Sequence, residues 1–94
     1  MNLGRETETL EFKKSTGELK EGIISIGAIL NKHQKGELYF GVRPDGTPIG
    51  QEISEKTLRD ISQAISNHIE PQIFPEIQTV RIDGKAVSYT HLTL

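Results

Sequence analysis

The chain has 94 residues, 34% of them hydrophobic, with no Cys and a formal net charge of −2. This length allows one small domain and excludes a two-domain enzyme, and the lack of Cys excludes disulfides, thiolate zinc sites and Cys nucleophiles. The slightly acidic charge argues against a non-specific DNA coat protein. The sequence has no Cys, no membrane-spanning run and no signal-peptide pattern, so we expect a cytoplasmic location.

The first third of the chain predicts a strand followed by a helix. Residues 9–13 alternate polar and apolar side chains, which is typical of a half-buried strand. Ser15 and Glu18 then have the spacing of a capping box at a helix start. From Glu18 to Lys32 apolar residues recur at helical spacing, which predicts an amphipathic helix. Its stripe consists of Leu19, Ile23, Ile26 and Leu30.

The middle of the chain predicts a buried strand and a turn. Residues 37–42 form a short apolar and aromatic run, as expected of a central strand that contacts both helices. Residues 43–46 predict a turn, because Pro44 fixes φ and Gly46 accepts a positive φ. Residues 47–50 can form only a short or edge strand, since Pro48 donates no backbone hydrogen bond.

The last third predicts a second helix and a hairpin. Ser54 caps an amphipathic helix over residues 55–69, which Glu70-Pro71 ends, and residues 73–82 read as a strand interrupted at Pro75. Residues 83–84 predict a hairpin turn and a return strand. The expected fold is α/β of the α+β type: a mixed sheet packed by two amphipathic helices, in the order β-α-β-β-α-β-β, with the last strand incomplete.

The last eight residues, Val87 to Leu94, read unlike the end of a domain. They resemble the translation of a transposase adapter used in sequencing libraries, so we expect residues 1–86 to be the domain and residues 87–94 to be non-native. The gene would then continue beyond this fragment, and Tyr89 and His91 receive no functional role. The alternative is an ordinary strand, because Val, Tyr and Thr favour strands.

Two charged clusters could carry chemistry. The carboxylates Glu6 and Glu11 could bind a divalent metal for phosphodiester cleavage if the chain bends near Thr9, although composition alone favours a solvated acidic edge. The basic residues could meet at one edge of the sheet and contact phosphates, although Lys is generally exposed. They are Lys13, Lys14, Lys32, Lys35 and Arg43.

The order of these motifs resembles a known family. Residues 6–13 (ETETLEFK), a helix ending in Asn31, residues 36–42 (GELYFGV) and the acidic Asp45-Gly46 turn are similar to the Schlafen-type Alba-like domain, also described as divergent AAA. The resemblance implies a DNA-binding domain at the N-terminus of bacterial proteins described as ATP-binding, helicase-like or transcriptional regulators. No phosphate loop supports ATP binding.

The resemblance also implies a site for the nuclease members, in which three carboxylates cooperate. Two of them match Glu6 and Glu11, but the third position, directly after Gly-Val, is Arg43. Asp45 could substitute only if the turn places it correctly. A guanidinium favours phosphate binding over a metal, so this departure weakens the nuclease hypothesis and leaves a metal cofactor expected only in that case.

Three functions therefore stay open. The leading hypothesis is a nucleic-acid-binding module, with DNA as the partner, in which Lys13, Lys32, Lys35 and Arg43 contact phosphates. Asn31 would fix the loop after the helix or contact the sugar-phosphate backbone. The alternatives are a metal-dependent endoribonuclease using Glu6, Glu11 and Asp45, and an interaction or homo-oligomerisation domain that positions a missing C-terminal region.

Overall fold

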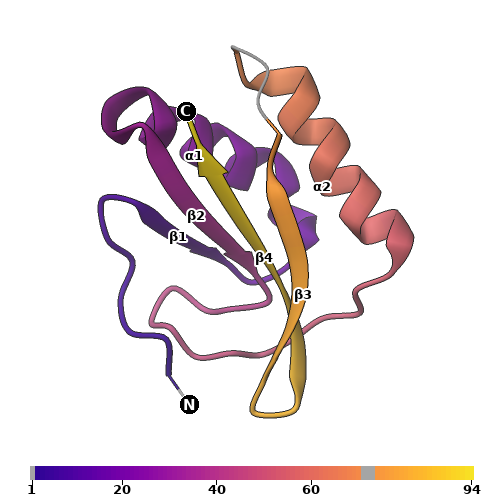
Figure 1. Ribbon diagram of the computed structural model, residues 1–94. Coiled ribbons are helices and arrows are strands. Elements are labelled where there is room, and N and C mark those ends of the chain that lie inside the picture. Colours follow the sequence, from indigo (N-terminus) through magenta and orange to yellow (C-terminus); the bar gives the residue numbers. More distant parts are fainter. Residues whose placement is uncertain (1, 71–73) are drawn as a thin grey trace.

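The structure is a computed structural model that describes residues 2–70 and 74–94 (Figure 1). Its elements are β1 Leu10–Lys13, the 3₁₀ turn η1 Thr16–Glu18, α1 Leu19–His33, β2 Lys35–Phe40, α2 Glu55–His68, β3 Glu76–Ile82 and β4 Lys85–Thr93. Two helices and a four-stranded mixed sheet confirm the expected α+β class.

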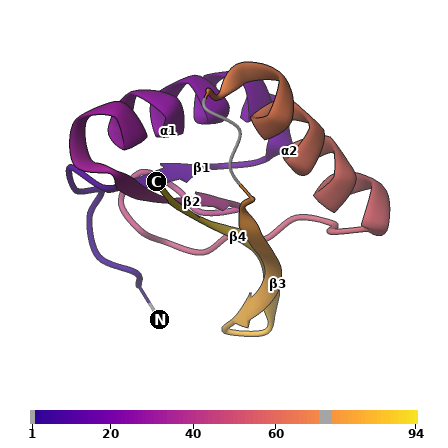
Figure 2. The same ribbon diagram turned by 45° about the horizontal axis from the view of Figure 1, so that its top comes forward.

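The strands form one sheet in the order β1-β2-β4-β3. β1 and β2 run parallel, whereas β4 is antiparallel to both of its neighbours. Both helices lie over the same face of this sheet (Figure 2). The opposite face meets the N-terminal segment and the chain between β2 and α2, which run below it in the same view. The outermost strands of the sheet are therefore β1 and β3.

The main core fills the space between the helices and the sheet. Leu38 and Phe40 of β2 are fully buried there, against the apolar stripes of both helices. This packing confirms that the central strand contacts both stripes. The helix residues in the core are Ile23, Ile26, Leu30, Ile61 and Ile65. Val42, just beyond β2, belongs instead to a smaller cluster with Phe12, Ile82 and Val87.

The two helices begin in different ways. The Ser15 hydroxyl accepts the N–H of Gly17 and thereby caps η1, not α1. Glu18 does not complete the expected capping box, because its carboxylate accepts the N–H of Lys14 at 3.2 Å. A capping box forms at α2, where the Ser54 hydroxyl and the Thr57 side chain each accept the other residue's N–H.

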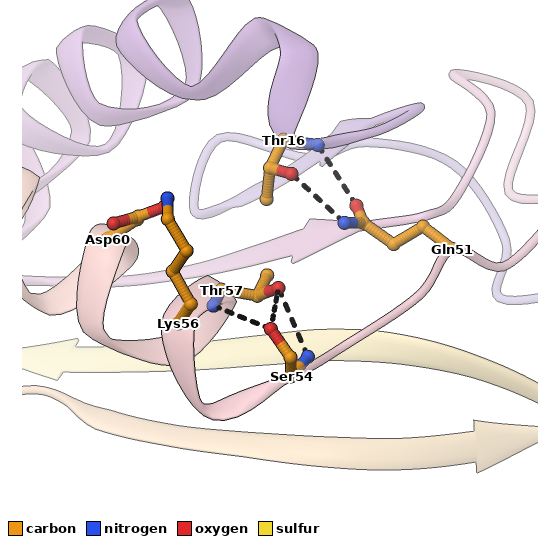
Figure 3. A network of polar contacts seen from close by, with 6 residues as sticks. All are labelled: Thr16, Gln51, Ser54, Lys56, Thr57 and Asp60. Carbon is orange, nitrogen blue, oxygen red and sulfur yellow. Dashed lines mark hydrogen bonds and ion pairs between the residues drawn. The ribbon is translucent and has the colours of Figure 1, made fainter.

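A polar network ties the segment between β2 and α2 to the rest of the fold (Figure 3). The Gln51 side chain accepts the N–H of Thr16 at 2.9 Å and donates to its hydroxyl at 3.0 Å. The backbone N–H of Gln51 donates to the carbonyl of Ala86 at 2.9 Å. One residue thus joins the start of α1 to β4, which fixes the end of the segment that carries Arg43.

The C-terminal half differs from the expectation at two places. Residues 47–50 form no strand, and only Pro48 makes a single bridge pair with Val42, consistent with its missing N–H. β4 continues to Thr93 rather than stopping short, and it pairs with β3 over residues 85–91 and with β2 over residues 88–93. The second helix ends at His68, one residue before the expected end at Ile69. The expected strand start at Ile73 lies outside the described residues, and β3 begins at Glu76.

Candidate nucleic-acid interface

The register of β1 on β2 decides which basic residues meet. Lys13 pairs with Phe40, so it lies at the end of β2 from which the chain continues to Arg43. Lys35 lies five residues before Phe40, which at about 3.3 Å per residue is roughly 17 Å away along the strand. The expectation of one common basic edge is therefore wrong, because the parallel pairing separates a Lys13–Arg43 end from a Lys32–Lys35 end.

Glu6 and Glu11 come together at the outer side of β1. The chain turns back at residues 8–9, because Thr7 and Leu10 exchange backbone hydrogen bonds of 3.0 and 3.4 Å. This bend lets a Glu6 oxygen accept the N–H of Phe12 at 3.0 Å. Burial raises the pKa of Glu11, and the hydrogen bond and charge of Glu6 raise that pKa further. The Glu11 carboxyl therefore retains a proton more readily than an isolated Glu.

Asp45 does not join this pair. Its carboxylate accepts the N–H of Thr47 at 3.0 Å, and the hydrogen bonds from Thr47 lower the pKa of Asp45. Within residues 2–70 and 74–94, no three His, Asp or Glu side chains form a group that could hold a metal ion. The structure therefore brings Glu6 and Glu11 together but supplies no third carboxylate from Asp45.

The cations at the Lys13–Arg43 end already face acidic side chains. The Lys13 ammonium lies 3.5 Å from a Glu11 oxygen, and the Lys13 side chain is only 20% exposed. Arg43 is exposed, and its positive charge helps to lower the pKa of the Asp45 carboxyl. This end carries charges of both signs, so its attraction for a phosphate is partly cancelled.

The Lys32–Lys35 end presents positive charge without such partners. Lys32 and Lys35 are both exposed, and neither forms an ion pair with an acidic residue in the described part of the chain. His33, between them in sequence, lies 3.8 Å from a Glu8 oxygen. Positive side chains also suit this position because it is the C-terminal end of α1. Of the four cations predicted to contact phosphates, Lys32 and Lys35 are therefore the best placed to attract one.

A surface hollow adjoins this end of the molecule. It has a volume of about 320 Å³ and is lined by Thr9, Lys35, Gly36, Glu37 and His91. The Thr9 carbonyl accepts the N–H of Glu37 at 2.8 Å, which holds β1 beside the start of β2. Thr9 and Glu37 were missed as site residues, because only the strand register, which no sequence motif encodes, brings them beside Lys35.

Asn31 lies close to the same end of α1. Its side chain is exposed and makes no hydrogen bond to any described residue, so it does not fix the loop as one hypothesis required. The loop is held instead by Gln34, whose left-handed backbone (φ 69°) directs its N–H to the Leu30 carbonyl at 2.9 Å. Asn31 keeps a free amide that can meet a ligand.

Comparison with known proteins identifies the family of the chain. None of the helices in residues 2–70 and 74–94 has the length and apolarity needed to cross a membrane. No curated protein matches the chain. The Schlafen, AlbA_2 family matches residues 6–93, which include both ends of the candidate interface and all four strands. The chain therefore belongs to the Schlafen, AlbA_2 family, whose domains are related to nucleic acids.

Proposed function

We propose that this domain binds the sugar-phosphate backbone of DNA, chiefly through Lys32 and Lys35. The proposal includes its place as the N-terminal part of a larger bacterial regulator or helicase-like protein. The observation that carries it is that Lys32 and Lys35 are both exposed and form no ion pair with a described acidic residue, while Lys35 also lines the hollow. Asn31, the residue before Lys32 in α1, adds a hydrogen bond to the backbone through its side-chain amide.

The two ends contribute unequally to this binding. Lys13 is mostly buried and paired with Glu11, so releasing it toward a phosphate costs its ion pair and its packing. Arg43 is exposed and has a guanidinium suited to phosphate, but Asp45 competes for it. The Lys32–Lys35 end therefore dominates affinity, while Arg43 makes a second, weaker contact about one strand length away.

The test is fluorescence anisotropy of labelled DNA duplex, and of single-stranded RNA, at several salt concentrations. Each phosphate contact contributes about 0.9 to the slope of log affinity against log salt. The double variant Lys32→Ala/Lys35→Ala should therefore reduce this slope by about 2 for DNA. The control Lys20→Ala/Lys56→Ala removes the same charge from other exposed helix positions and should leave the slope nearly unchanged.

Two results would contradict this function. Equal losses in the test and control variants would show that only net charge matters, with no interface at the Lys32–Lys35 end. No binding of DNA at low salt by the unaltered chain would reject a DNA-binding module. Binding of RNA but not DNA would support the basic interface and would identify RNA as its ligand.

The convergence of Glu6 and Glu11 favours a second function, a metal-dependent endoribonuclease. The residues present do not complete a three-carboxylate metal site, and the Lys13 ammonium beside Glu11 opposes a cation there. Cleavage of structured RNA with manganese, lost in Glu11→Gln but kept in Glu8→Gln, would support a nuclease. Glu8 is the matched control because it is an exposed, neighbouring carboxylate. Cleavage that is absent, or equal in both variants, would reject it.

A further inference from the structure

The outer edge of β1 is closed to pairing with another strand. Carbonyls of Thr9 and Lys13 accept N–H groups from the β2 side, so the N–H groups of the alternate residues Leu10, Phe12 and Lys14 point outward. Each of these three already donates a hydrogen bond within the chain. Their acceptors are the Thr7 carbonyl at 3.4 Å, the Glu6 carboxylate at 3.0 Å and the Glu18 carboxylate at 3.2 Å.

The outer edge of β3 is open. The two-residue turn Asp83-Gly84 has positive φ angles of 54° and 77°, so Ile82 and Lys85 form the hydrogen-bonded pair that closes the hairpin. Alternation along β3 then turns the N–H and carbonyl groups of Ile77, Thr79 and Arg81 away from β4. No described residue hydrogen-bonds to these outward backbone groups. Such an edge is a ready template for another strand.

We propose that two copies of this chain join through their β3 edges, as an antiparallel pair centred on Thr79, into one eight-stranded sheet. A two-fold axis at Thr79 sets Ile77 of each copy opposite Arg81 of the other. All three outward N–H groups and all three outward carbonyls of each copy then find partners. No like charges face each other, and Thr beside Thr is a favourable cross-strand pair.

The surroundings of β3 suit a second copy of the chain. α2 packs beside Ile77, near the start of β3, whereas Thr79 and Arg81 are exposed. In the antiparallel pair, the α2 helices of the two copies therefore lie at opposite ends of the interface. Phe74 is 92% exposed just before β3. Phe74 precedes β3 by two residues, so a second copy at this edge lies next to an exposed apolar side chain.

The experiment is sedimentation velocity of the 94-residue chain over a wide range of concentration. We expect a dimer that dissociates on dilution. Thr79→Pro removes an outward N–H and keeps those that bind β4, and proline is tolerated at such edge positions. This change should raise the dissociation constant about tenfold to a hundredfold, because two hydrogen bonds across the joint are lost. Circular dichroism checks that the variant stays folded.

Thr79→Val is the matched control, because it alters the side chain and leaves the backbone edge intact. It should dimerise like the unaltered chain. A monomer at every concentration, or a dimer that Thr79→Pro leaves unchanged, would overturn the proposal. Assembly into species larger than a dimer would also overturn the proposal, because the closed β1 edge leaves each copy only one edge for strand pairing. None of these results depends on nucleic-acid binding, which is assigned to Lys32 and Lys35 rather than to β3.

Discussion

Thr90 offers the sharpest test of the packing in the core. It lies in β4 between Leu38 and Ile77 on the helix-facing side of the sheet, and it is fully buried. Its hydroxyl has no hydrogen-bond partner among the described residues. A buried hydroxyl without a partner costs about 1–3 kcal/mol, and valine has the same branched shape without that cost. We therefore expect Thr90→Val to raise the free energy of unfolding by about 1–2 kcal/mol.

Urea unfolding followed by circular dichroism measures this change as a higher midpoint with an unaltered slope. In a thermal scan, each kcal/mol corresponds to a rise of about 4–8 °C for a domain of this size. Thr79→Val is the control, because Thr79 is exposed and the same substitution there should stay within about 0.5 kcal/mol. A neutral or destabilising Thr90→Val would mean that the hydroxyl is satisfied in solution, by a buried water for example, and would refute the argument.

Four further substitutions test the packing and the charges of the fold. Gly22→Ala should lower the free energy of unfolding, measured in urea, by about 1–2 kcal/mol, because the added Cβ would lie 2.9 Å from the Phe40 ring. Gly27→Ala should instead raise the free energy of unfolding, because the nearest atom to its added Cβ is 3.8 Å away. Ile65→Ala should cost about 2–4 kcal/mol because the side chain is fully buried. Because the pKa of Glu11 is raised, Glu11 contributes stability below its ordinary pKa of 4.5 and loses that contribution as the pH rises. Between pH 4 and 7, the urea midpoint of Glu11→Gln should therefore fall less than that of the unaltered chain.

The helices and the core could be predicted from the sequence because their signals are local. Ile23 and Ile26 repeat at the period of a helix, and so do Ile61 and Ile65. The aromatic and branched run around Leu38 marks a strand that is covered by both stripes. Each of these patterns lies within about four turns of one element, so no knowledge of the tertiary pairing is needed to see it.

The candidate interface could be predicted only in part, because it depends on pairing between distant segments. No sequence pattern near Lys13 or Lys35 indicates that their strands are parallel. This parallel pairing alone places the two lysines at opposite ends of the sheet. The bend that joins Glu6 to Glu11 was recognisable as a requirement, since a flat strand would point them to opposite faces. Its realisation depends on hydrogen bonds between Thr7 and Leu10, which sequence spacing does not encode.

The buried hydroxyls also bear on the origin of residues 87–94. Ser88, Thr90 and Leu92 face the helices from the middle of the sheet, where apolar side chains are expected, yet two of the three carry hydroxyls without a described partner. If the natural chain diverges after Ala86, we expect apolar residues at positions 88 and 90. Sequencing the genomic locus tests this expectation, and the same codons in an intact reading frame would contradict it. In that case the higher stability of Thr90→Val would reflect an unsatisfied hydroxyl in the natural core, and not a non-native sequence in β4.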